Sequence, residues 1–168
     1  DLAMGEKIHQ FMMTGYDSVS GGGIYWREGD KKTKNTCSNG PDVILLMQLF
    51  QATNKKSYLN EAIAVYNWTN KQLRSPEHLF YDNLNVKTGA ISKHFFSYNA
   101  GTMLQSNVYL YEATKDKTYL KEAIQIAQSA TKYFLGSGHF RDDYWFNAVC
   151  LRGLQHLYKH NKDNQYLK

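Results

Sequence analysis

The sequence predicts an all-α protein built from helical hairpins, and an internal repeat is the main reason. Residues 52–63 recur as residues 113–124 with a constant offset of 61, and a degraded third copy lies at 161–168. Each copy follows an apolar run with helical spacing. We therefore expect pairs of helices, each pair joined by a short turn.

The individual helices follow from these runs. A lone helix is predicted at about 2–13, before the first hairpin. In each hairpin, Ser57 or Thr118 is predicted as the N-cap of the second helix, with Glu61 or Glu122 in its first turn. A last apolar run at 146–157 predicts a final helix, and its return helix stops after Lys168. The array thus begins and ends halfway through a unit.

The connections between hairpins are longer than the turns within them. They cover 15–36, 75–95 and 136–142, and they contain the sequences SGGGIYW, HLFYDNLN and GSGHFRDDYW. Glycines permit positive φ angles, and exposed Tyr and Trp offer flat apolar faces that suit sugar rings. We expect these three aromatic loops to share one carbohydrate-binding rim. The alternative for each aromatic side chain is that it caps the helical core.

Composition excludes several classes of protein. The formal net charge is +5, but the basic residues are scattered apart from Lys31, Lys32 and Lys34, so no nucleic-acid partner is expected. No apolar run approaches the roughly 18 residues of a membrane span. Cys37 and Cys150 are the only cysteines and lie far apart, so we expect free thiols. No motif for a cofactor is present, and none is expected.

One pair of histidines has metal-ligand spacing. His156 and His160 lie at i and i+4 on the predicted last helix. No neighbouring carboxylate or cysteine in the sequence completes a site. We therefore expect no metal, and a solvated pair near the end of the helix.

Four motifs, in order, resemble those of glycoside hydrolase family 76, the endo-α-1,6-mannanases. They are GGGIYW, the segment KNTCSNG at 34–40, FYD at 80–82 and SYNAGT at 97–102. The resemblance implies an (α/α)6 toroid, of which this chain supplies roughly half. Residues 1–168 would then be a single all-α segment of a truncated catalytic domain. The resemblance also implies an α-mannan ligand and an exported protein, periplasmic or extracellular.

The resemblance further implies which residues bind substrate. Tyr25 and Trp26 would stack on sugar rings, while polar side chains would hydrogen-bond sugar hydroxyls. The alternative for Asn39 and Thr102 is that they cap or buttress helices. The full expected set is Tyr25, Trp26, Asn35, Asn39, Tyr81, Asp82, Tyr98, Asn99 and Thr102.

The family's catalytic pair is two adjacent aspartates acting by a retaining mechanism, which requires carboxyl groups about 5 to 5.5 Å apart. Asp142 and Asp143 form such a pair and are the alternative catalytic assignment. The family's pair precedes the glycine loop, however, and this pair follows it. We therefore expect Asp142 to be an N-cap, Asp143 to favour the helix dipole, and the true pair to be absent. Alone, the chain would bind sugar and hydrolyse nothing.

Two other functions compete with this interpretation. A non-catalytic helical-repeat module could bind a glycan or peptide, but its repeat would be about 34 residues rather than 61. The second competing function is a toroid with sugar-epimerase or unsaturated glucuronyl hydrolase activity. An epimerase would require catalytic histidines on inner helices. Because the toroid is cut, its exposed hairpin flanks predict a possible homodimer.

Overall fold

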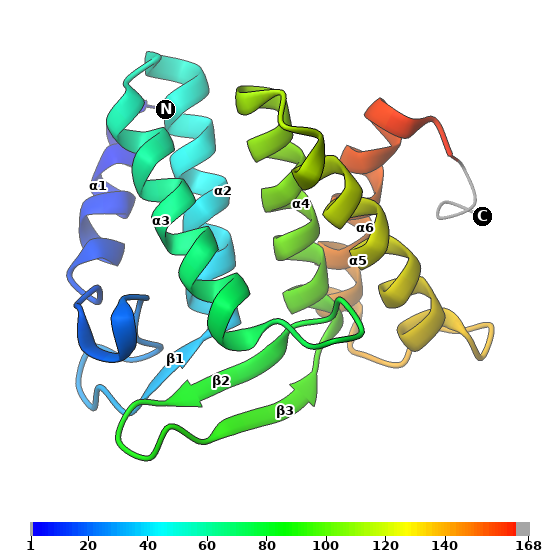
Figure 1. Ribbon diagram of the computed structural model, residues 1–168, viewed down its shortest axis with the longest axis horizontal. Coiled ribbons are helices and arrows are strands. Elements are labelled where there is room, and N and C mark those ends of the chain that lie inside the picture. The colour runs from blue at the N-terminus through cyan, green and yellow to red at the C-terminus, as the bar shows by residue number, and fades with distance from the viewer. Residues whose placement is uncertain (1, 164–168) are drawn as a thin grey trace. The chain divides into compact units, whose positions relative to one another are not determined.

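The computed structural model describes residues 2–163, and within them it is mostly helical (Figure 1). The helices are α1 (Leu2–Met13), α2 (Thr36–Thr53), α3 (Lys56–Leu73), α4 (Ser97–Thr114), α5 (Lys117–Leu135) and α6 (Tyr144–Asn161). The chain divides into two compact units. Unit 1 runs to Leu73 and adds Asp82–Lys93, and unit 2 takes Arg74–Tyr81 and the chain from His94 onward.

Unit 1 contains the predicted lone helix α1 and the first hairpin, α2 with α3. The hairpin turn is closed by Asn54, whose φ is 55° and whose N–H donates to Phe50 O at 2.7 Å. Apolar side chains from both helices form the core, among them Val43, Leu46, Met47, Val65 and Leu73. Burial of this face explains why the apolar spacing predicted the hairpin.

Unit 2 repeats the hairpin and adds α6. Helix α4 begins 61 residues after α2, and Lys115 closes the turn with φ 61° and an N–H bond to Tyr111 O. Lys162 makes the same left-handed turn after α6, at the third copy of the repeat. The remainder of that copy, including Tyr166, lies outside the described residues. The predicted helical-hairpin array is thus confirmed.

Glycines set the contact between α4 and α6. A Cβ built on Gly101 would lie 2.5 Å from Cys150 Cα, and one built on Gly153 would lie 2.6 Å from Gly101 O. Only glycine allows the two backbones to approach this closely. Burial raises the pKa of the Cys150 thiol at this contact to about 12, so this cysteine stays protonated and unreactive.

Both predicted N-caps are wrong. Asp116, not Thr118, caps α5, since its carboxylate accepts from the Thr118 N–H at 2.8 Å. Ser57 lies within α3, which begins one residue earlier at Lys56. A carboxylate two residues upstream is a stronger acceptor for the helix N-terminus than the hydroxyl at 118, which itself donates to Asp116.

A small sheet was not predicted. The connections form β1 (Thr33–Asn35), β2 (Tyr81–Asn85) and β3 (Ile91–Phe95), in the order β1-β2-β3. Strands β1 and β2 pair antiparallel, with Lys34 opposite Leu84. The strands are short, and β2 is largely polar, so no apolar alternation marked it. None of the helices within residues 2–163 is long and apolar enough to cross a membrane.

Candidate functional site

The glycine loop of unit 1 lies against the indole of Trp68. Four consecutive residues, 20–23, have positive φ angles of 58°, 82°, 125° and 84°. The Trp68 Nε1–H donates to Ser20 O at 2.9 Å, and a Cβ on Gly23 would lie 2.6 Å from the indole ring. The glycines are therefore required so that the backbone can pass over this ring.

The side chain of Lys34 is hydrogen-bonded to the glycine loop and to the residues before it. The sequence did not predict this role. Lys34 is fully buried, and its ammonium donates to Asp17 Oδ1 at 2.7 Å, to Val19 O at 2.8 Å and to Gly22 O at 2.7 Å. Burial acts to raise the Asp17 pKa, but bonds from Lys34 and from the Val19 N–H hold it below its ordinary value. A charged pair thus fixes the loop.

The two aromatic residues after the glycines differ in exposure. Tyr25 is 7% exposed, with the Lys34 ammonium 4.6 Å from its ring centroid. Burial, followed by the charge of Asp17, raises the Tyr25 pKa. Trp26 is 53% exposed, and the Arg27 guanidinium lies 4.6 Å from its ring centroid. Trp26 therefore presents more of its ring to solvent.

The predicted polar residues of unit 1 occupy the start of α2 and the strand region. Asn39 is fully buried. It accepts from Ile24 N at 2.8 Å and donates to Ile24 O and Asn35 O, which is the geometry of the buttress alternative. The Oδ1 atom of Asn35 is buried without a hydrogen-bond partner among the described residues. Asp82 is half-buried and accepts from Asn83 Nδ2.

In unit 2, three predicted residues share the first turns of α4. Tyr98 is half-buried, and its ring lies edge-on to Phe146 at 4.3 Å. Asn99 is fully buried, and neither atom of its amide has a hydrogen-bond partner in the described range. Thr102 donates to Asn99 O at 3.2 Å. Separately, Tyr81 stacks on Phe95 with centroids 5.1 Å apart.

Of the two adjacent aspartates, Asp142 does not cap its own helix as predicted. Asp143 occupies the N-cap position of α6, but its side chain makes no capping bond. The Asp142 carboxylate instead accepts from Ser97 N at 2.6 Å, at the first residue of α4. The predicted N-cap role of Asp142 for its own helix is therefore wrong: Asp142 caps a different helix, because the loop carries it one residue too far from α6.

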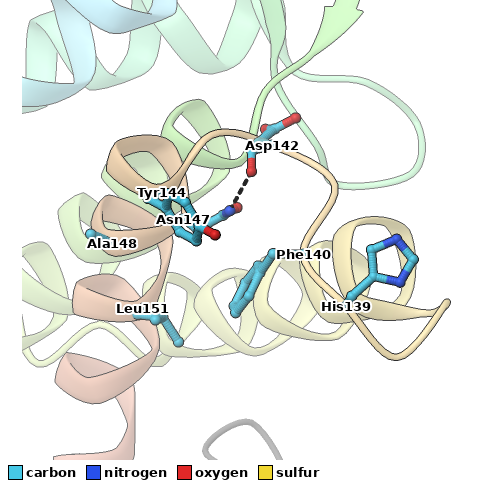
Figure 2. A pocket seen from close by; sticks show the side chains of 7 residues that line it. All are labelled: His139, Phe140, Asp142, Tyr144, Asn147, Ala148 and Leu151. Carbon is cyan, nitrogen blue, oxygen red and sulfur yellow. Dashed lines mark hydrogen bonds between the residues drawn. The ribbon is translucent and has the colours of Figure 1, made fainter.

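Asp142 also borders a pocket of about 630 Å³ (Figure 2). Its backbone carbonyl accepts from Asn147 Nδ2 at 2.6 Å, and Asn147 in turn accepts from the Ser97 hydroxyl. These bonds tie the loop before α6 to the start of α4. The lining is otherwise largely apolar and aromatic, with Phe140, Tyr144, Ala148 and Leu151.

The histidine pair has a partner that the sequence did not indicate. Glu112 on α4 places Oε1 at 3.0 Å from His156 Nε2 and 2.7 Å from His160 Nε2. Contact across 44 residues depends on the packing of α4 on α6, which sequence spacing does not reveal. We name these three residues the α4–α6 cluster.

Comparison with known proteins identifies a family and several relatives that are similar to this chain. The profile of the family described as glycosyl hydrolase family 76 matches residues 2–168. A mannan endo-1,6-alpha-mannosidase of Candida albicans is 27% identical over 79% of this chain and 32% of its own length. The chain spans about a third of the length of the curated relatives it matches.

Solved structures give the same result. A family 76 mannosidase of Bacteroides thetaiotaomicron is 30% identical, with a TM-score of 0.91, and the match covers 99% of this chain and 50% of that one. An α-1,6-mannanase of Salegentibacter, inactivated at two adjacent aspartates and bound to α-1,6-mannotetrose, is 29% identical with a TM-score of 0.86. That match covers 94% of this chain and 50% of the mannanase. The predicted fold class, roughly half of an (α/α)6 toroid, agrees with these shares.

Proposed function

Because this chain belongs to glycoside hydrolase family 76, we propose that it forms the sugar-binding side of a cleft that acts on α-1,6-linked mannan. The observation that carries the proposal is the likeness to an α-1,6-mannanase structure that holds an α-1,6-mannotetrose. The chain would be one all-α segment of a larger catalytic domain. Its activity in that domain would be retaining endo-hydrolysis.

The proposal assigns ligand contact first to Trp26. An indole that is 53% exposed beside a rigid loop supplies a flat apolar face at little cost in conformational entropy. The loop itself is held by the buried Lys34 and Asn39, so the position of Trp26 is fixed before a sugar arrives. In unit 2, Asn99 is the residue that we expect to bind sugar, because its buried amide has no hydrogen-bond partner among the described residues.

The same proposal leaves this chain without a catalytic pair. A nucleophile and an acid/base must both face the scissile bond. The carboxylate of Asp142 is occupied by the N–H of Ser97, and Asp143 stands at the N-cap of α6. The bond supports a structural role for Asp142, and the N-cap position supports one for Asp143; they are the only adjacent aspartates in the sequence.

The test is binding of α-1,6-mannotriose, measured by isothermal titration calorimetry on the chain and on Trp26→Ala. We expect weak binding by the chain and a loss of about 1 to 3 kcal/mol in the variant, the worth of one stacked or hot-spot aromatic. Ile91→Ala is the control, because Ile91 is also an exposed apolar side chain but lies on β3 outside the predicted set. Equal binding by wild type and Trp26→Ala would refute the assignment.

A further inference from the structure

The α4–α6 cluster has the composition of a transition-metal site. Glu112 comes from α4, and His156 and His160 come from successive turns of α6. Two imidazole nitrogens and one carboxylate oxygen are a donor set that zinc and its neighbours in the first transition series prefer, whereas magnesium and calcium prefer oxygen ligands alone. We propose that these three residues bind a divalent transition-metal ion such as Zn²⁺.

The distances fit such an ion. One ligand atom from each residue lies within 4.8 Å of the other two. Around a tetrahedral zinc with bonds of 2.0 to 2.2 Å, ligand atoms stand about 3.3 Å apart. Glu112 Oε1 is already 3.0 Å and 2.7 Å from the two Nε2 atoms. Small side-chain shifts that lengthen these two contacts would therefore admit the ion.

The side chains are held in place before an ion binds. The close contact of Gly101 and Gly153 fixes α4 against α6. The His156 ring lies edge-on to Tyr109 with centroids 4.4 Å apart, and the His160 ring lies edge-on to Tyr111 at 5.7 Å. Fixed helices and packed rings reduce the entropy lost when the ligands converge.

Access and coordination are also suitable. The His156 side chain is 9% exposed, but those of His160 and Glu112 are 26% and 24% exposed, so an ion can enter from solvent. Three protein ligands leave a fourth position for water. Within residues 2–163 the Nδ1 atom of His156 is buried without a hydrogen-bond partner, so no described residue gives it the outer-shell bond that strengthens many sites. Affinity should accordingly be about 10- to 100-fold below that of a fully supported site.

The position of the cluster points to a structural role. Glu112 lies 15 residues along α4 from Ser97, a distance of about 22 Å in a helix. The pocket beside Asp142 lies at the Ser97 end. A bound ion would therefore clamp α4 to α6 near the tight-turn end of unit 2, away from the predicted sugar contacts on the first turns of α4.

The test uses tag-free chain, dialysed against a chelator and then titrated with Zn²⁺ by calorimetry and with Co²⁺ by visible absorption. We expect one ion per chain, a raised melting temperature and the intense d–d bands of tetrahedral cobalt. Glu112→Gln and His160→Ala should each weaken binding at least about 10-fold. Excess Mg²⁺ should not compete.

Two controls keep the result decisive. His139→Ala removes an exposed histidine outside the cluster and should leave the affinity unchanged. Circular dichroism of each variant confirms that it is folded, and His160 is exposed enough for its truncation to be tolerated. Absence of binding by the wild-type chain, or equal affinity in folded His160→Ala, would overturn the proposal.

Discussion

Asp42 on α2 is wholly buried and lies with Oδ1 3.5 Å from Nδ1 of His9 on α1. Neither carboxylate oxygen has a hydrogen-bond partner in the described part of the chain, and His9 Nε2 faces Glu61 at 3.0 Å. Burial raises the Asp42 pKa from 3.8 to about 6, although the nearby His9 acts to lower it. A carboxyl group this far inside unit 1 is costly to ionise.

This pKa predicts a pH dependence of folding. Because the folded value lies above the unfolded one, Asp42 contributes stability that is fully present below about pH 4 and is lost as the pH rises through 6. At 1.4 kcal/mol per pKa unit, the loss is about 3 kcal/mol. Asp42→Asn avoids the buried charge. Urea unfolding at pH 4 and at pH 7.5 gives the free energy of unfolding of both proteins. The value for the variant minus that for the wild type should rise by about that amount between the two pH values. A difference that does not change with pH would contradict the assignment.

The glycine loop predicts a position-specific cost of alanine. Gly21→Ala meets nothing within 4 Å and should cost only the positive-φ penalty, about 1 to 2 kcal/mol. Gly23→Ala adds a clash with Trp68 and should cost a further 1 to 3 kcal/mol, roughly. Denaturant unfolding of both variants measures the difference. Equal costs would show that the loop does not rest on the indole.

Lys34→Met tests the buried ammonium. The change removes the ammonium from the Asp17 carboxylate and from the backbone carbonyls of residues 17, 19 and 22, so we expect a loss of about 3 to 5 kcal/mol in unfolding free energy. Lys32→Met is the matched control, since its side chain is 74% exposed and 3.8 Å from Asp30. The control should change stability by less than about 1 kcal/mol. A small effect at Lys34 would remove the basis for a rigid loop.

The exposed apolar side chains of helix α1 lead us to expect that the chain forms a homodimer. Met4, Ile8 and Phe11 are between 46% and 66% exposed and have the i, i+4, i+7 spacing of one helix face, which makes an apolar face on α1. We expect the isolated chain to pair through this face, and Phe11→Lys to restore a monomer. Light scattering distinguishes the two states. A monodisperse wild-type monomer would count against the predicted homodimer.

The sequence predicted elements whose signal is local and periodic. Apolar spacing and the 61-residue repeat located α2 with α3 and α4 with α5. The buried face of each helix requires apolar residues at a spacing of three and four, and this spacing is visible in the sequence. Strand β2 was not predicted, because its residues are largely polar and the strand is short. Resemblance, rather than periodicity, selected the candidate sugar-binding residues.

Lys34 and Glu112 could not be found in this way. A lysine close to two others, Lys31 and Lys32, is typical of a solvated cluster, and only the fold of residues 17–22 around Lys34 buries its ammonium. Glu112 meets the histidines through α4 and α6, and their contact depends on Gly101 and Gly153 rather than on any spacing near residue 156. Such contacts arise from tertiary packing.

The most direct measurement is the release of reducing ends from linear α-1,6-mannan by this chain and by an Asp142→Asn, Asp143→Asn double variant. Asparagine at 142 keeps an acceptor for the Ser97 N–H, so the variant should fold. The account predicts no hydrolysis by either protein, because the Asp142 carboxylate is bonded to the Ser97 N–H and Asp143 lies at the N-cap position of α6. Hydrolysis by the wild type that is lost in the double variant would contradict it and make Asp142 and Asp143 the catalytic pair.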